Sequence, residues 1–113
     1  MDIHVMKLSI TLKNLMFCSL LFCISSAFSE EDKFDAAQTY KTTCFACHGT
    51  GAAHSPEVGD VIEWEIRLEK GLDTLVKNSI NGLNGIMPPR GLCVDCSDAQ
   101  LKAIVEYMLE SSQ

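Results

Sequence analysis

The chain has 113 residues, with nine lysines and arginines against 15 aspartates and glutamates, so its formal net charge at neutral pH is −6. A chain this acidic argues against binding to nucleic acid and against strong adhesion to anionic lipid. Its six cysteines are many for so short a chain and require a chemical explanation.

The first 29 residues are typical of a secretory signal peptide. Lys7 and Lys13 precede an apolar run over residues 15–24, and small residues follow up to Ser29. The apolar run is shorter than the roughly 20 residues that span a bilayer, which makes an uncleaved membrane anchor the weaker alternative. We therefore expect cleavage after Ser29 and export to the periplasm of a Gram-negative bacterium.

Residues 30–113 are expected to form one small domain. It contains seven lysines and arginines against 14 aspartates and glutamates, a net charge of −7. A domain of this size rarely folds on an apolar core alone, so a disulfide or a cofactor is expected. The acidic surface suits a partner protein that presents a basic docking patch.

Four segments of this domain have the apolar period of an α-helix. We expect helices over about residues 32–47, from Asp60 to Gly71, from Leu72 to Gly82, and from Ser97 onward. Ser97, with Gln100 three residues later, predicts a capping box at the start of the last helix. Residues 81–95 contain three glycines and two prolines and have no helical period, which predicts a loop. No segment is typical of a strand, so the expected fold is all-α.

Cys44, Cys47 and His48 form a C-x-x-C-H motif. Two intervening residues on a helical turn place both sulfurs on one side, at a separation that suits thioether bonds to the two vinyl groups of a porphyrin. The histidine that follows can then reach the iron as the proximal ligand. The motif predicts one covalently attached haem c.

A second pair, Cys93 and Cys96, leaves two other interpretations of the cysteines. Four cysteines could hold zinc, but 45 residues separate Cys47 from Cys93, and His48 would then have no role. A thioredoxin-like redox pair requires a βαβ context, which the sequence lacks. The export signal and the spacing therefore favour haem.

Met87 is the predicted second axial ligand. It directly precedes Pro88 and Pro89, which restrict the backbone and present the thioether on a stiff segment. Met108 lies on the apolar stripe of the last helix, where we expect it to fill the core. His54 follows the C-x-x-C-H motif by only six residues, too few to cross easily to the opposite haem face. Histidine–methionine ligation favours electron transfer over the binding or activation of oxygen.

The C-x-x-C-H motif, Trp64 and the segment 80–91 around Met87 resemble the class I cytochromes c. Residues 71–107, which include the second cysteine pair, resemble the bacterial cytochrome c5 group in particular. The likeness covers nearly all of residues 30–113. It implies a small fold of about four helices around one haem. In that fold the first and last helices cross, so that Ala36 and Tyr40 meet Ile104 and Tyr107.

The resemblance also implies roles for residues around the haem. It implies that the Pro56 carbonyl accepts a hydrogen bond from the His48 ring, which would fix the tautomer and strengthen the iron ligand. Trp64 and Arg67 resemble residues near the haem propionates, with core packing and a solvated charge as the respective alternatives.

Two further implications concern the loop that carries Met87. The second cysteine pair is implied to form a disulfide, Cys93–Cys96. Either Asn81 or Asn84 could donate a hydrogen bond to the methionine sulfur, and the sequence does not choose between them.

The function that follows is single-electron transfer between respiratory proteins, without enzymatic turnover. The donor and acceptor proteins, and the choice between a monomer and a weak dimer, are not evident from the sequence. The alternatives are a haem subunit of an oxidoreductase complex and a haem-based ligand sensor, which would need a vacant or labile sixth iron position. A third alternative is a binding module that carries a disulfide and no haem.

Overall fold

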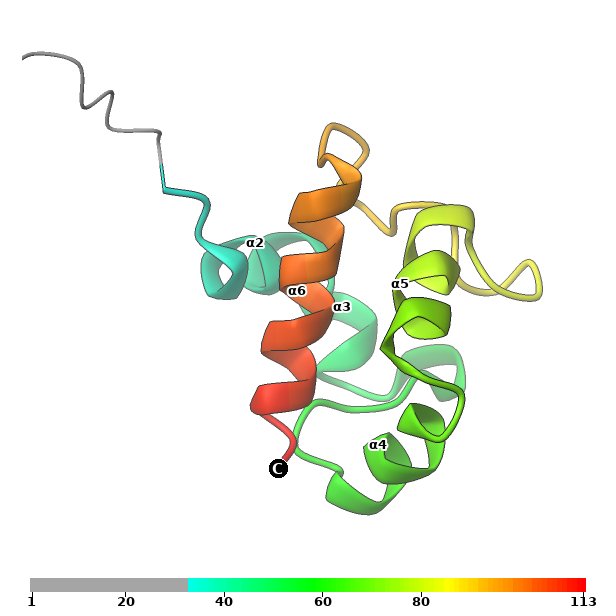
Figure 1. Ribbon diagram of the computed structural model, residues 1–113. Helices are drawn as coiled ribbons and strands as arrows, with labels where there is room; N and C mark the ends of the chain where they lie inside the picture. Colours follow the sequence, from blue (N-terminus) through cyan, green and yellow to red (C-terminus); the bar gives the residue numbers. More distant parts are fainter. Residues whose placement is uncertain (1–32) are drawn as a thin grey trace, which may run out of the picture. The chain divides into compact units, whose positions relative to one another are not determined.

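Over residues 33–113 the computed structural model contains five α-helices and one short 3-10 helix (Figure 1). They are α2 (Ala36–Thr43), α3 (Phe45–His48), η2 (Ala52–His54), α4 (Val61–Leu68), α5 (Leu72–Asn81) and α6 (Asp98–Glu110). The structure describes residues 33–113. The predicted signal peptide, residues 1–29, lies outside the described residues.

The all-α expectation is confirmed. Within residues 33–113 the only β-type pairing is an isolated bridge between Leu83 and Met87. The helices of that same range lack the length and apolar character that a membrane span requires.

The first helix differs from the prediction of one helix over residues 32–47. It begins only at Ala36, because the Asp35 carboxylate accepts from the Gln38 N–H at 2.8 Å and caps it there. It then breaks at Cys44, whose φ of −122° and ψ of −26° separate α2 from the single turn of α3.

Threonines account for the break physically. The Thr42 hydroxyl bonds to the carbonyls of Gln38 and Thr39, and the Thr43 hydroxyl bonds to the Thr39 carbonyl at 2.7 Å. Hydroxyls that bond back one turn compete with the backbone ladder and bend helices. The break therefore falls immediately after Thr43, at the first cysteine of the motif.

Helix α4 begins at its expected cap, and both expected ends of α5 are confirmed. However, α4 ends at Leu68 and not at Gly71, because the Gly71 N–H bonds to the Leu68 carbonyl three residues back, at 2.8 Å, and so closes a tight turn. Asp60 caps α4 by accepting from the Glu63 N–H at 3.1 Å. Gly71 and Gly82 flank α5 with φ of 84° and 79°, in the region that favours glycine. At Gly82 a Cβ atom would also lie 2.6 Å from the Met87 carbonyl oxygen, so a larger residue would displace the loop that carries Met87.

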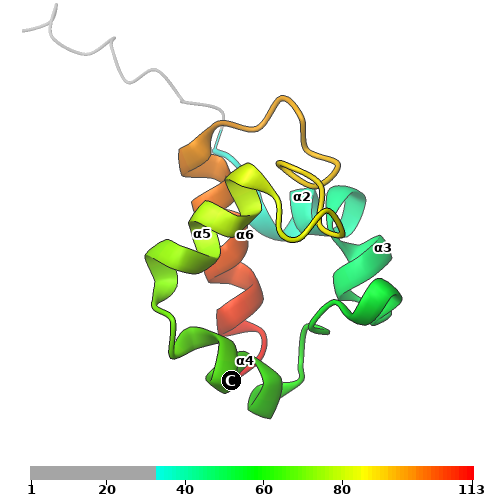
Figure 2. The ribbon, with the colours of Figure 1, turned by 90° about the vertical axis from the view of Figure 1, so that its right-hand side faces the viewer.

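Helix α6 carries the predicted capping box. The Ser97 hydroxyl accepts from the Gln100 N–H at 3.2 Å, and the Gln100 side chain accepts from the Ser97 N–H at 2.8 Å. The helix packs on α2 and on α5 (Figures 1 and 2). Where α2 and α6 meet, the rings of Tyr40 and Tyr107 lie 5.5 Å apart, as the resemblance implied.

The buried core joins α2, α4 and α6. Its members are Tyr40, Trp64, Cys96, Leu101, Ile104 and Met108. Each of these side chains is at most 6 % exposed, and Ile104 is the least exposed at 2 %. The core therefore joins α2 and α4 to α6 through buried side chains.

Candidate haem site

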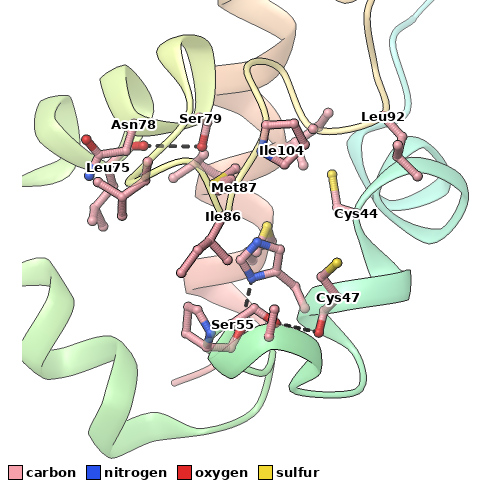
Figure 3. A pocket seen from close by; sticks show the side chains of 18 of the residues that line it. Cys44, Cys47, Ser55, Leu75, Asn78, Ser79, Ile86, Met87, Leu92 and Ile104 are labelled. Atoms are coloured by element: carbon pink, nitrogen blue, oxygen red, sulfur yellow. Dashed lines mark hydrogen bonds between the residues drawn. The ribbon is translucent and has the colours of Figure 1, made fainter.

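One cavity of about 380 Å³ brings together segments that are distant in the sequence. Residues from α3, η2, α4, α5, α6 and the loop 83–92 line it (Figure 3). Its lining is mainly apolar, and its size is within the range of small-molecule and cofactor sites. All the residues predicted to contact the cofactor lie on its wall, namely Cys44, Cys47, His48, Pro56, Trp64, Arg67 and Met87.

The single turn of α3 places the motif on one side of the cavity. The N–H groups of Cys47 and His48 both bond to the Cys44 carbonyl, at 3.2 and 3.0 Å. Both thiols are free, and Figure 3 shows them at the same edge of the cavity. Burial raises the pKa of the Cys44 thiol, while the Thr43 hydroxyl, 3.3 Å from its sulfur, opposes the shift.

The His48 ring is oriented by a carbonyl. Its Nδ1 lies 2.9 Å from the Pro56 oxygen, and because a carbonyl can only accept, Nδ1 must carry the proton. The other ring nitrogen, Nε2, is then the unprotonated atom that can bind a metal. Burial lowers the pKa of His48, the bond to Pro56 partly opposes this, and the Arg67 charge lowers it further. Burial thus favours the neutral imidazole, which is the metal-binding form.

Trp64 and Arg67 approach the cavity from α4. Trp64 is buried in the core, its Nε1 donates to the Glu57 carbonyl at 2.7 Å, and its ring centroid lies 6.2 Å from that of His48. Arg67 is half-buried and bonds through Nε to Glu63 at 2.8 Å. Trp64 therefore serves both core and cavity, and Arg67 is not a free solvated charge.

Met87 lines the same cavity from the loop after α5. The Leu83 N–H donates to the Met87 carbonyl at 2.9 Å, and the Met87 N–H donates back to the Leu83 carbonyl at 3.1 Å. Asn84, in the turn between them, lines the cavity, whereas Asn81 is not among the lining residues. Neither asparagine is bonded to the sulfur in the described part of the chain.

The other two ligand candidates lie where the sequence placed them. Met108 is 4 % exposed and belongs to the core cluster, with part of its surface on the cavity wall. His54 is exposed at the rim, with φ of 61°, in the same segment as the C-x-x-C-H motif.

Several residues that line the cavity were not predicted from the sequence. Asn78 and Ser79 enter from α5, and the exposed Ile86 and Leu92 flank the cavity from the Met87 loop. Arg90 also lines it, and its guanidinium bonds to neighbouring segments. Arg90 stands between two prolines and a glycine, and a lone cation in such a stiff segment was the signal that could have identified it.

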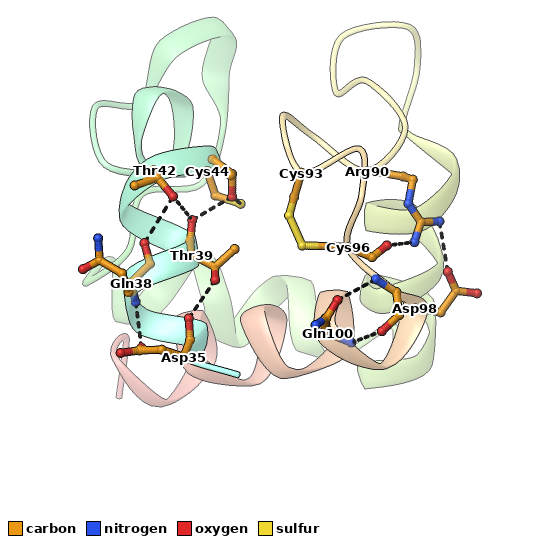
Figure 4. The surroundings of a disulfide bond; sticks show 12 residues. Asp35, Gln38, Thr39, Thr42, Cys44, Arg90, Cys93, Cys96, Asp98 and Gln100 are labelled. Atoms are coloured by element: carbon orange, nitrogen blue, oxygen red, sulfur yellow. Dashed lines mark hydrogen bonds and ion pairs between the residues drawn. A yellow bond between two sulfur atoms is a disulfide. The ribbon is translucent and has the colours of Figure 1, made fainter. Parts of the chain in front are cut away.

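The second cysteine pair is joined as a disulfide, Cys93–Cys96 (Figure 4). Neither sulfur is therefore available to zinc. Within residues 33–113 no cluster of three or more histidine, cysteine or acidic side chains is arranged to hold a metal ion. Two thiols, one imidazole and one thioether around an apolar cavity fit haem c, and the four-cysteine zinc alternative is excluded.

Comparisons with known proteins agree with this site. A family model described as cytochrome C oxidase, cbb3-type, subunit III, matches residues 32–108. Cytochrome c5 of Azotobacter vinelandii is 51 % identical over 67 residues, which cover 58 % of this chain and 80 % of the relative. Cytochrome c-555 of Chlorobaculum tepidum is 40 % identical over 86 residues, which cover 71 % of this chain and 80 % of the relative.

Two solved structures have the same fold. A mono-heme ferrocytochrome c from Shewanella putrefaciens is 43 % identical, with a TM-score of 0.60, over 70 % of this chain and 95 % of that one. The cytochrome c in an electron transfer complex with nitrite reductase is 34 % identical, with a TM-score of 0.62, over 67 % of this chain and 91 % of that one.

The fold and the site thus define a small monohaem c-type cytochrome, an electron carrier rather than an enzyme, with one covalent haem c and its iron. The chain belongs to the class I cytochromes c, and its similarity is to the cytochrome c5-like members of that family.

Proposed function

We propose that this protein is an exported carrier that passes single electrons between respiratory proteins of the periplasm. In this proposal Cys44 and Cys47 form the thioether bonds, and His48 and Met87 are the axial ligands. The observation that carries it is the placement of two thiols, the free His48 Nε2 and the Met87 thioether around one apolar cavity.

Each residue of this set has a definite task. Haem, when bound, supplies a one-electron iron couple. The Pro56 carbonyl holds the His48 ring in one tautomer and makes the imidazole a stronger donor. The Met87 thioether favours the ferrous state over the ferric state relative to a second histidine. Ile104 and the other apolar residues of α6 exclude water from the wall.

The charge distribution supports a basic docking patch on the partner. Residues 57–73 contain six acidic residues and two basic ones, so this short segment carries much of the negative charge. Ile86 and Leu92 line the cavity and are 66 % and 65 % exposed, so they offer a partner an apolar contact at the cavity. We propose transient complexes with redox proteins, a monomer or weak dimer, and no nucleic-acid or strong membrane binding.

An alternative places the chain as a haem subunit of an oxidoreductase complex, since the matching family model takes its name from an oxidase subunit. The two proposals differ in whether the protein is stably bound to other proteins. A diffusing carrier is recovered free from the periplasmic fraction, whereas a subunit co-purifies with its complex.

Mass spectrometry of the periplasmic fraction tests the main proposal. We expect the measured mass to be that of a chain that begins at Glu30, carries one haem and lacks the two hydrogens lost on forming the Cys93–Cys96 disulfide. A haem-free chain would overturn the cofactor assignment, and a chain that retains residues 1–29 would overturn cleavage. Carbon monoxide supplies the second test, because ready binding to the reduced protein would favour the ligand sensor instead.

A further inference from the structure

Arg90 lies at the end of the segment that carries Met87 and is unusually constrained. Its φ is 64°, in the left-handed region that a residue with a Cβ adopts only at a cost. Its side chain is 26 % exposed and lines the haem cavity. Such a conformation persists only where the surrounding contacts enforce it.

The contacts of Arg90 reach three separate elements. Its backbone N–H donates to the Ser79 carbonyl in α5 at 2.8 Å. Its Nη2 donates to the Cys96 carbonyl in the disulfide loop. Its Nη1 donates to the Asp98 carboxylate at 3.0 Å, at the first residue of α6 (Figure 4). One residue therefore joins α5, the disulfide loop and α6.

The two prolines make this anchor necessary. Pro88 and Pro89 have no backbone N–H, so the first backbone donor after Met87 is that of Arg90. Among residues 33–113, the backbone N–H and carbonyl of Met87 bond only to Leu83, across a turn whose central residues are exposed. The position of the thioether thus depends on a short bridge before it and on Arg90 after it.

We infer that Arg90 is a positioning residue that holds Met87 toward the cavity by fixing the end of its loop. The inference rests on the proposed ligation of iron by Met87. A thioether is a weak, neutral ligand, so its retention depends on how little the loop can move. Loss of the guanidinium frees the disulfide loop and α6 from the loop that carries Met87 and makes the sixth iron position more accessible to added ligands.

The experiment measures imidazole binding to the ferric holoprotein by absorption spectroscopy. Arg90→Ala is suitable because alanine retains the Cβ atom, so the backbone strain at φ 64° is unchanged and only the guanidinium is lost. We expect imidazole to bind about tenfold more tightly, since the loss of hydrogen bonds from a charged donor is of that order. Lys102→Ala is the matched control, because it removes a cation and a 3.7 Å ion pair within α6, outside the loop that carries Met87.

Two further variants separate positioning from general stability. Arg90→Lys keeps the charge but not the fork that reaches both Cys96 and Asp98, so it should fall between alanine and the native protein. Asp98→Asn keeps the contact to Cys96 and should give a smaller change in the same direction. If Arg90→Ala does not accumulate as holoprotein, imidazole binding to these two variants tests the role of Arg90 in its place.

The outcomes are distinguishable from failure of the proposed function. If the native ferric protein lacks the weak near-red band of methionine-ligated iron, the ligation by Met87 is wrong. If the native band is present and lost in Met87→Ala, but the Arg90 variants bind imidazole as the native and Lys102→Ala proteins do, the inference about Arg90 is wrong. Tighter imidazole binding in all variants, Lys102→Ala included, would also overturn it by showing a general loss of stability.

Discussion

Removal of the Cys93–Cys96 disulfide has an effect on stability that can be estimated from the structure. The bond closes a ring across a sequence separation of three. For so small a ring the chain-entropy relation gives about 6 cal/mol/K, or about 2 kcal/mol at room temperature. Cys96 is also 6 % exposed and packs in the core, so replacing its sulfur adds about 1 kcal/mol.

Two variants separate these contributions. Cys93→Ala breaks the cross-link and leaves the buried Cys96 sulfur in place, so it should lower the free energy of unfolding by about 2 kcal/mol. The double variant Cys93→Ala/Cys96→Ala should lower it by about 3 kcal/mol. Urea unfolding of the ferric holoproteins, followed by circular dichroism, measures both values.

A free energy of unfolding for Cys93→Ala within about 0.5 kcal/mol of the native value, with the same denaturant slope, would contradict this expectation. The disulfide would then contribute no cross-link entropy. An equal loss in the single and double variants would instead show that the Cys96 sulfur contributes nothing through packing.

Three other changes have defined outcomes. Trp64→Phe removes the donor to the Glu57 carbonyl and should cost about 1–3 kcal/mol in urea unfolding; a loss under about 0.5 kcal/mol would show that the bond is dispensable. Ser97→Ala removes the cap that binds the Gln100 N–H and should cost about 1 kcal/mol, with no change in the haem spectrum. Burial raises the pKa of Tyr40 above 10.0, so the folded state keeps a proton that the unfolded chain releases. The contribution of Tyr40 to the free energy of unfolding is therefore complete below pH 10.0 and is lost as the pH rises above it. Tyr40→Phe should flatten this alkaline fall in stability. An unchanged dependence of stability on pH would contradict the expectation.

The sequence predicted those features of the fold that depend on local chemistry. Asp60 and the Ser97–Gln100 pair cap their helices because the side chain and the backbone donor are only three residues apart. Gly71 and Gly82 flank α5 because the backbone at those positions has positive φ, which glycine adopts at little cost. Each such signal is complete within one turn of the chain.

The break at Cys44 and the role of Arg90 were not predicted, for two different reasons. The break depends on threonine hydroxyls that compete with a helix whose apolar period continues across it, so periodicity alone overlooks it. The contacts of Arg90 join α5, the disulfide loop and α6, whose proximity exists only in the folded chain. The apolar residues of α6 likewise form a helical stripe in the sequence, but their place beside the motif around one cavity is a tertiary feature.

The near-red absorption of the ferric holoprotein tests the central claim, ligation of the haem iron by His48 and Met87, most directly. We expect a weak methionine-to-iron band in the native protein and its loss in Met87→Ala. Met108→Leu should retain the band, because Met108 is a core residue at 4 % exposure. A native spectrum without the band, or a band that survives in Met87→Ala, would contradict it.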